Sequence, residues 1–297
     1  MNDFKKIART ISVIENHLDG YKEILLNLPS SISSPIIGIT GAPGSGKSTI
    51  TDKLIKNIIV QNKTVAVLCV DPSSPFNMGA LLGDRIRMSD WYTHKNVFIR
   101  SLASRKALGG LSPMIIEITE YLKTTGFDFV IVETVGVGQT EIDIAGLADI
   151  TLVTLIPESG DEIQTMKSGI MEVADIFVVN KSDKPGADML VKNLHAMLAS
   201  HSKVVNDIPI VKTIANTGTG IDELYNVIEK TIVSSKEINQ KKCWLFTEKA
   251  YYLIQSNKMR NIHKEDLFKE IGMRMKDEGT FNLYRFVQPY IQQDQNG

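Results

Sequence analysis

Several short apolar runs, rich in valine and isoleucine, recur along the chain between stretches of helical periodicity. They span residues 36–40, 64–70, 97–100, 129–134, 150–156, 176–180 and 208–214. Each run is nearly continuous in hydrophobicity instead of alternating with polar residues, which is typical of strands covered on both faces. The pattern predicts an α/β fold with a doubly wound, mostly parallel sheet flanked by helices.

Helical patterns flank this predicted domain on both sides. Between Phe4 and Leu28, apolar residues recur every three or four positions, the period of an amphipathic helix, and Gly20 is expected to divide it. Proline and serine then fill residues 29–35, as in a linker. From about residue 235 the pattern changes to helices with charged and aromatic faces. We therefore predict an N-terminal helical extension (1–34), a central α/β domain (35–234) and a C-terminal helical arm (235–297).

The composition indicates a globular protein and argues against several classes of partner. Lysine plus arginine number 33 against 34 for aspartate plus glutamate, so the net charge of -1 favours neither nucleic acid nor an anionic membrane. Two cysteines, Cys69 and Cys243, suggest neither a disulfide framework nor a zinc site, which fits a reducing compartment. No apolar stretch approaches the roughly 20 residues that span a bilayer, and no secretory signal is recognisable. We expect a cytoplasmic protein.

The first apolar run leads into a glycine-rich loop that matches the phosphate-binding pattern G-x-x-x-x-G-K-[ST]. The loop and its first helical residues are Gly41, Ala42, Pro43, Gly44, Ser45, Gly46, Lys47, Ser48 and Thr49. Glycines let the backbone wrap around phosphate oxygens, and the following helix adds the partial positive charge of its N-terminus. We predict that Lys47 reaches the β- and γ-phosphates and that Ser48 places its hydroxyl on Mg²⁺.

A second motif, Asn180-Lys181-Ser182-Asp183, follows a later apolar run and matches the N-K-x-D pattern of guanine-specific proteins. The carboxylate of Asp183 can accept hydrogen bonds from guanine N1–H and from the exocyclic N2 amine, an arrangement that adenine does not offer. Asn180 is predicted to support the ring edge, and the stem of Lys181 to pack over it. The two motifs together favour GTP and GDP as the bound nucleotides.

Acidic residues near the ends of predicted strands are candidate magnesium ligands. Glu133 ends an apolar strand, while Asp71 and Asp84 are hard oxygen donors suited to Mg²⁺ or to its coordinated waters. By composition alone, Asp84 is equally compatible with an ordinary helix start. Downstream of Glu133, Gly136 can bring its backbone amide to the γ-phosphate, and Gln139 could orient the attacking water.

With these blocks, the sequence resembles the MeaB/ArgK family of P-loop GTPases, the G-protein chaperones of adenosylcobalamin-dependent acyl-CoA mutases. The resembling segments lie in order between about residues 35 and 230, and they comprise residues 41–49, 71–75, 82–88, 98–105, 108–110, 132–139, 160–164 and 180–183. The block Glu-Thr-Val-Gly-Val-Gly-Gln at 133–139 is especially distinctive. The number and order of these blocks favour the family assignment.

The resemblance implies a GTP-hydrolysing homodimer of the methylmalonyl-CoA mutase-associated type, whose C-terminal arm mediates dimerisation. It implies that Asp71 and Asp84 belong to a mobile loop that engages Mg²⁺ and the hydrolytic water, that residues 133–139 form a second switch, and that residues 160–164 lie in a third switch facing the client. Ala215 takes the place of the alanine whose amide meets guanine O6, although the usual Ser-Ala pair is absent. The predicted catalytic residues are therefore Lys47, Asp84, Glu133 and Gln139, and the predicted metal ligands are Ser48, Asp71, Asp84 and Glu133.

Two other functions share parts of this pattern and stay open as alternatives. A nickel-insertion GTPase normally needs a Cys/His-rich metal site, whereas the five histidines of this chain are scattered without ligand spacing. A small-molecule kinase or transport ATPase would need an acceptor site and a lid, for which the sequence gives no distinct signal, and the N-K-x-D motif argues against adenine. The expected partner is an adenosylcobalamin-dependent acyl-CoA mutase, with no nucleic acid and no membrane.

Overall fold

The computed structural model describes residues 3–29, 34–71, 85–103, 112–134, 140–157, 173–200, 208–234, 240–259, 262–277 and 282–292. The chain divides into two compact units, residues 1–245 and 246–297. The first unit contains the sheet and the helices packed on it, and the second contains only helices among its described residues.

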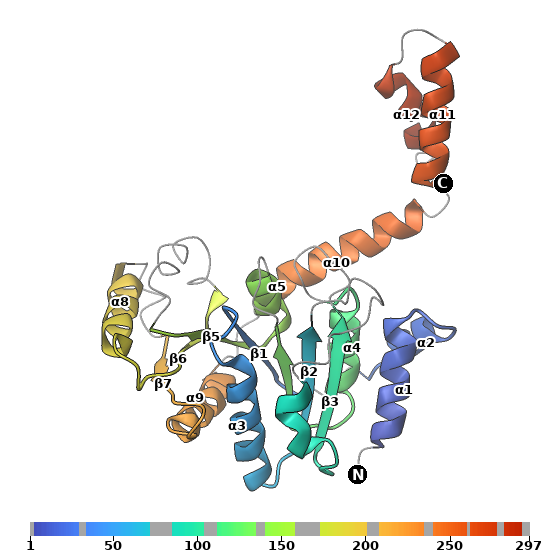
Figure 1. Ribbon diagram of the computed structural model, residues 1–297. Coiled ribbons are helices and arrows are strands. Elements are labelled where there is room, and N and C mark those ends of the chain that lie inside the picture. The colour runs from blue at the N-terminus through green and yellow to red at the C-terminus, as the bar shows by residue number, and fades with distance from the viewer. Residues whose placement is uncertain are drawn as a thin grey trace. The chain divides into compact units, whose positions relative to one another are not determined.

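The first unit is built on a seven-stranded sheet in the order β3-β2-β4-β1-β5-β6-β7 (Figure 1). Every pair of neighbouring strands is parallel, which confirms the predicted fold class. The strands are β1 (Ile36–Gly41), β2 (Val65–Asp71), β3 (Val97–Ala103), β4 (Phe129–Glu133), β5 (Ile150–Leu155), β6 (Ile176–Val179) and β7 (Ile210–Lys212). Because all strands run the same way, the residues that follow β1, β4 and β6 meet at one edge of the sheet.

Helices cover both faces of this sheet, and alternate residues of each strand enter opposite cores. In β1, Ile37 and Ile39 pack with Leu54 of α3, whereas Ile36 belongs to the other core with Ile11 of α1. One face carries α3 (Lys47–Val60), α9 (Ile221–Ser234) and the 3₁₀ helix η1 (Arg85–Trp91). The other carries α1 (Phe4–Glu15), α4 (Ile115–Lys123), α5 (Thr140–Leu147) and α8 (Ala187–Ser200). This is a three-layer α/β/α arrangement with the sheet buried on both sides.

The N-terminal segment forms two helices that pack onto the sheet. Gly20 adopts a φ of 88° immediately before α2 (Tyr21–Leu26), so the predicted break in the amphipathic pattern is confirmed. Helix α1 buries Ile7, Ile11 and Ile14 against residues of β2, β3 and α4. An ion pair of 2.9 Å between Arg100 of β3 and Glu15 adds a polar link at the end of α1. The extension therefore shares the hydrophobic core of the sheet.

Helix α5 is held between the sheet and the first residues of α10 (Gln240–Lys258) by two close glycine contacts. A Cβ at Gly38 of β1 would lie 2.7 Å from Ile144 Cγ1 and 2.9 Å from Ala148 Cβ. At Gly146, a Cβ would lie 2.8 Å from Leu245 Cβ. Both distances are shorter than carbon atoms tolerate, so larger residues at either glycine would displace α5.

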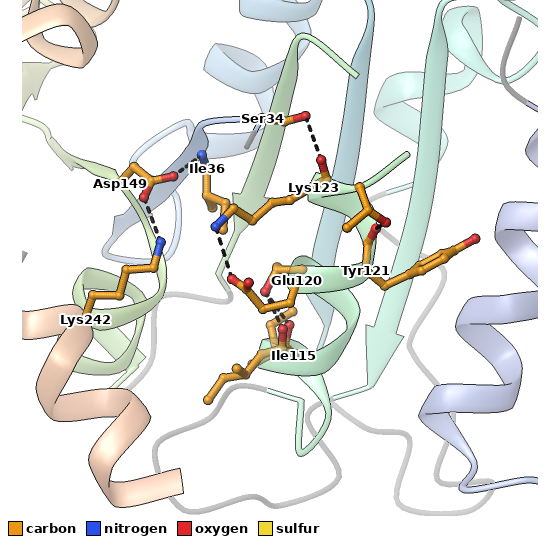
Figure 2. A network of polar contacts seen from close by, with 11 residues as sticks. Ser34, Ile36, Ile115, Glu120, Tyr121, Lys123, Asp149 and Lys242 are labelled. Atoms are coloured by element: carbon orange, nitrogen blue, oxygen red, sulfur yellow. Dashed lines mark hydrogen bonds and ion pairs between the residues drawn. The ribbon is translucent and has the colours of Figure 1, made fainter. Parts of the chain in front are cut away.

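A polar network fixes the start of α10 at the amino ends of the central strands (Figure 2). The carboxylate of Asp149 accepts the amide of Ile36 at 2.8 Å and pairs with Lys242 Nζ at 2.8 Å. Burial alone would lower the pKa of Lys242, but the hydrogen bond to Asp149 and the charges of Asp149 and Glu120 outweigh it, so the pKa is raised. Lys242 therefore stays protonated through neutral pH, at the end of the sheet opposite the glycine-rich loop.

The second unit consists of the remainder of α10, α11 (Lys264–Asp277) and α12 (Leu283–Gln292). Within it, Tyr290 donates to Glu270 at 2.9 Å, and the guanidinium of Arg274 lies 5.3 Å from the ring centroid of the buried Phe286. Several large apolar side chains in this unit are exposed, including Tyr251, Tyr252, Leu253, Ile254, Phe268 and Tyr284. In the described part of the chain, no helix has the length and apolarity to cross a membrane.

Candidate functional site

The glycine-rich loop connects β1 to α3, and its glycines adopt conformations that other residues rarely adopt. Gly41, Gly44 and Gly46 have φ values of 140°, 78° and 96°, and Gly46 is the residue that caps α3. At Gly41 a Cβ would also lie 2.2 Å from the carbonyl oxygen of Thr154 in β5. The loop therefore needs glycine at these positions for backbone conformation and, at Gly41, for space.

Lys47 is the first residue of α3, and its ammonium lies beside the loop. Lys47 Nζ donates to the carbonyl oxygens of Gly41 at 2.8 Å and Ala42 at 3.1 Å, and the side chain is buried. The positive charge is thus held next to a helix N-terminus, the combination that binds phosphate groups in proteins. The structure thus shows the Lys47 ammonium at the loop, and its contact with the β- and γ-phosphates stays a prediction.

Glu133, at the end of β4, is held by two hydroxyl groups from α3. Ser48 Oγ donates to Glu133 Oε1 at 2.5 Å, and Thr51 Oγ1 lies 2.9 Å from Glu133 Oε2. All three side chains are buried. Asp71 is buried at the end of the neighbouring strand β2, and a donor set made of hydroxyl and carboxylate oxygens fits a hard cation such as Mg²⁺.

Asn180 connects the glycine-rich loop to the segment after β7. Its amide nitrogen donates to Ser45 O at 2.8 Å, and its Oδ1 accepts from Thr213 Oγ1 and from the amide of Ala215, both at 3.1 Å. A Cβ at Gly46 would lie 2.2 Å from Asn180 Nδ2, so the glycine is needed for this contact. The sequence suggested that the polar groups of Asn180 support the edge of the guanine ring. In the structure these groups align the glycine-rich loop with the segment after β7.

These elements surround a cavity of about 740 Å³ at the carboxyl edge of the sheet. Its lining includes Lys47, Ser48, Glu133, Asn180, Lys181, Asp183 and Ala215, together with Pro43, Gly44, Gly46 and Thr49 of the loop and its helix. The structure therefore brings both sequence motifs to one cavity, with the phosphate loop and the N-K-x-D segment both on its wall. A volume of this size is in the range of nucleotide and cofactor sites.

Three predicted site residues, Asp84, Gly136 and Gln139, lie outside the described residues, as does the predicted third switch at 160–164. Within the described ranges, no group of three or more His, Cys, Asp or Glu side chains is arranged to hold a metal ion. The described residues therefore give the nickel-insertion alternative no support.

Three threonines make contacts around the cavity that the sequence did not indicate. Thr51 contacts Glu133, Thr213 donates to Asn180, and Thr134 donates to Thr40 Oγ1 at 3.0 Å. Thr134, which was predicted only as part of the second switch, and Lys184 also line the cavity. Thr51 alone had a usable signal, because a residue three positions after Ser48 lies on the same face of a helix.

Asn180→Ala is expected to destabilise the protein and to weaken nucleotide binding together. Removing the amide leaves Ser45 O and the amide of Ala215, both buried, without this partner, which costs about 2–4 kcal/mol. In a domain of this size that corresponds to a Tm lower by about 10 °C, measurable by calorimetry. The control Asn57→Ala removes a more exposed bond to Asp222 on α9 and should change the Tm by no more than about 3 °C. Equal Tm values for the two variants would show that Asn180 does not align the loops.

The phosphate loop, the parallel sheet and the N-K-x-D segment on one cavity define a P-loop GTPase. The family described as "Methylmalonyl Co-A mutase-associated GTPase MeaB" matches residues 7–266 of this chain. The chain belongs to that family, which confirms the resemblance inferred from the sequence, and it is a GTPase.

Comparison with individual proteins agrees with this assignment. A Pyrococcus abyssi protein described as a GTPase is 44% identical over 233 residues, which cover 77% of this chain and 72% of that protein. The fused isobutyryl-CoA mutase of Geobacillus kaustophilus is 32% identical over 256 residues, which cover 80% of this chain and 24% of that protein. The crystal structure of an LAO/AO transport system kinase is 23% identical, with a TM-score of 0.69 over 98% of this chain and 94% of that one, a likeness of fold.

Proposed function

We propose that this GTPase is a metallochaperone that gates the loading or protection of adenosylcobalamin in a cobalamin-dependent acyl-CoA mutase of the methylmalonyl-CoA mutase type. The observation that carries the proposal is the match to the mutase-associated family across residues 7–266. The fused isobutyryl-CoA mutase supports it, because most of this chain matches a segment within that mutase polypeptide. A GTP cycle would then act on a neighbouring mutase active site.

The nucleotide site would assign separate tasks to the two motifs in the cavity. The loop amides at 41–49 and the ammonium of Lys47 would bind the phosphates and offset the negative charge that develops during attack by water on the γ-phosphate. Asp183 would select guanine, with the stem of Lys181 over the ring and the amide of Ala215 near O6. The presence of Lys47, Lys181, Asp183 and Ala215 in the lining of one cavity supports these assignments.

Mg²⁺ would be held by Ser48 with Asp71, Asp84 and Glu133, directly or through water, and would supply charge neutralisation between the phosphate groups. Gly136 would donate its amide to the γ-phosphate, and Asp84 and Gln139 would orient the attacking water. Of these residues, Ser48 and Glu133 lie on the cavity wall, and Asp71 is buried at the end of the strand beside β4.

The proposed partner is the mutase, and the proposed assembly is a homodimer through the C-terminal arm in the cytoplasm. The exposed aromatic and aliphatic side chains of the second unit, such as Tyr251, Leu253 and Phe268, support an arm that buries apolar surface against another chain. No feature of the described residues calls for nucleic acid, since the net charge of the chain is -1.

A cobalamin-loading experiment tests this proposal. A purified adenosylcobalamin-dependent acyl-CoA mutase without cofactor is mixed with adenosylcobalamin and this protein, and the absorbance of bound cobalamin is followed with GTP, with a non-hydrolysable GTP analogue and with GDP. The amount or rate of loading should differ by about fivefold or more between nucleotide states. Loading that is identical with GTP, GDP and no nucleotide would exclude a gating role while leaving GTP hydrolysis intact.

A further inference from the structure

Thr51 is a fully buried hydroxyl residue of α3 that faces Glu133 across the interface between α3 and β4. Its Oγ1 lies 2.9 Å from Glu133 Oε2, and its exposed fraction is 0%. Ser48, one turn earlier on the same helix, donates from its Oγ to Glu133 Oε1, the other carboxylate oxygen, at 2.5 Å. The carboxylate of Glu133 is therefore held at both oxygens by hydroxyls of a single helix.

Each hydroxyl has one hydrogen, and this limits which acceptor it can donate to. Thr51 Oγ1 also lies 3.0 Å from the carbonyl oxygen of Lys47, but a hydroxyl has one hydrogen to donate. The hydrogen bond to an ionised carboxylate is the stronger of the two. The hydroxyl of Thr51 therefore donates its hydrogen bond to Glu133. The hydroxyl of Ser48 likewise donates its one hydrogen bond to Glu133. The lone pairs of Ser48 Oγ are then left to bind another group.

We propose that Thr51 is a positioning residue for the divalent-cation site. It holds Glu133 in the orientation that accepts the hydroxyl hydrogen of Ser48, and the lone pairs of Ser48 Oγ are thereby presented to the cation. Without Thr51, the glutamate would lose the hydroxyl bonded to its Oε2 and could rotate away from Ser48. The inference rests on the Mg²⁺ dependence in the proposed function, and it adds a residue to which neither sequence motif extends.

A purely structural role for a buried threonine has a direct counterpart in the same protein. Thr119 of α4 is also fully buried, and its hydroxyl bonds to carbonyl oxygens of its own helix, Ile115 O at 2.8 Å and Ile116 O at 2.9 Å. Within the described residues no carboxylate bonds to that hydroxyl, and Thr119 does not line the nucleotide cavity. Thr119→Val therefore controls for loss of a buried helical hydroxyl as such.

The test measures the Mg²⁺ dependence of nucleotide binding and does not require turnover. The affinity of the full chain for fluorescent GDP is measured over a Mg²⁺ titration and in EDTA, for the wild type, Thr51→Val, Thr51→Ser and Thr119→Val. Thr51→Val should raise the Mg²⁺ concentration at the midpoint about tenfold, the effect typical of losing an outer-shell partner of a metal site. Thr51→Ser, which keeps the hydroxyl, and Thr119→Val should stay within about twofold of the wild type. In EDTA all four proteins should bind GDP equally.

Three outcomes separate the possible failures. A midpoint for Thr51→Val that coincides with the wild type overturns the role of Thr51 and leaves the proposed function standing. A wild-type affinity for GDP that is indifferent to Mg²⁺ contradicts the Mg²⁺ part of the proposed function itself. If Thr51→Val does not fold, Thr51→Ala provides a second hydroxyl-free variant with the same expected shift, and a wild-type midpoint for it overturns the inference in the same way.

Discussion

Lys47→Ala is expected to lower the rate of GTP hydrolysis by about a thousandfold. The ammonium of Lys47 lies against the carbonyl oxygens of the loop at 2.8 and 3.1 Å, on the wall of the cavity that holds both motifs. As charge develops on the transferred phosphoryl group, a fixed cation in a partly enclosed site contributes several kcal/mol, and losing one such group costs about 10²–10³ in rate. Phosphate release under single-turnover conditions measures this loss at the chemical step.

The matched control is Lys56→Ala on the same helix. Lys56 lies on the exposed face of α3 and is absent from the lining of the nucleotide cavity. Its removal changes the net charge by the same amount, so a general electrostatic effect would appear in both variants. Hydrolysis by Lys47→Ala within about threefold of the Lys56→Ala rate would contradict the assignment of Lys47.

Asp183→Asn is expected to reduce the affinity for GDP by about a thousandfold and to favour xanthosine diphosphate instead. The carboxylate would accept from two guanine donors, and each hydrogen bond to a charged group is worth about 1.5–3 kcal/mol. An asparagine amide places a donor where guanine also presents a donor, whereas xanthine presents a carbonyl at that position. Titration calorimetry with guanosine, xanthosine and adenosine diphosphates measures the three affinities.

A suitable control for this variant is Asp188→Asn. Asp188 is an exposed residue in the first turn of α8, where it pairs with Lys212 at 3.1 Å, and it lies outside the nucleotide cavity lining. Exposed pairs of this kind contribute little, so the affinity for GDP should stay unchanged. If Asp183→Asn kept the wild-type preference for guanine over xanthine, another residue would have to read the base.

The sheet was predictable because its strands are apolar on both faces. The run at 36–40 became β1 and the run at 129–134 became β4, each within one residue at its ends. The run at 208–214 was too long, since β7 covers only Ile210–Lys212. Strand β7 is one of the two edge strands of the sheet. An edge strand is hydrogen-bonded on one side only, and its hydrophobicity says little about where pairing stops.

The order of strands and the helix contacts depend on information that local patterns lack. β1 lies between β4 and β5, which are far along the chain, and only the connection rules of parallel sheets limit such an order. The close fit of α5 between Gly38 and Leu245 is likewise invisible in the sequence, because Gly38 and Gly146 look like ordinary glycines until their neighbours are known.

For the site as well, the local motifs could be predicted from the sequence and the long-range contacts could not. The loop at 41–49 and the N-K-x-D segment carry their chemistry in fixed spacing, so both could be predicted as parts of one nucleotide site. The bond of Thr51 to Glu133 joins residues 82 positions apart, and that of Asn180 to Ser45 spans 135 positions. Such contacts depend on how β4 and β6 are placed beside α3 and the loop before it. No sequence motif encodes that placement.

Capture of partners from the native cell extract tests the central claim, that the nucleotide state of this GTPase governs its action on a mutase. The full chain is immobilised and loaded with a non-hydrolysable GTP analogue or with GDP, and the retained proteins are identified by mass spectrometry. The account predicts that a cobalamin-dependent acyl-CoA mutase is recovered and that its amount differs between the two nucleotides by about fivefold or more. Failure to recover such a mutase in either state, or recovery in equal amounts in both, would contradict it.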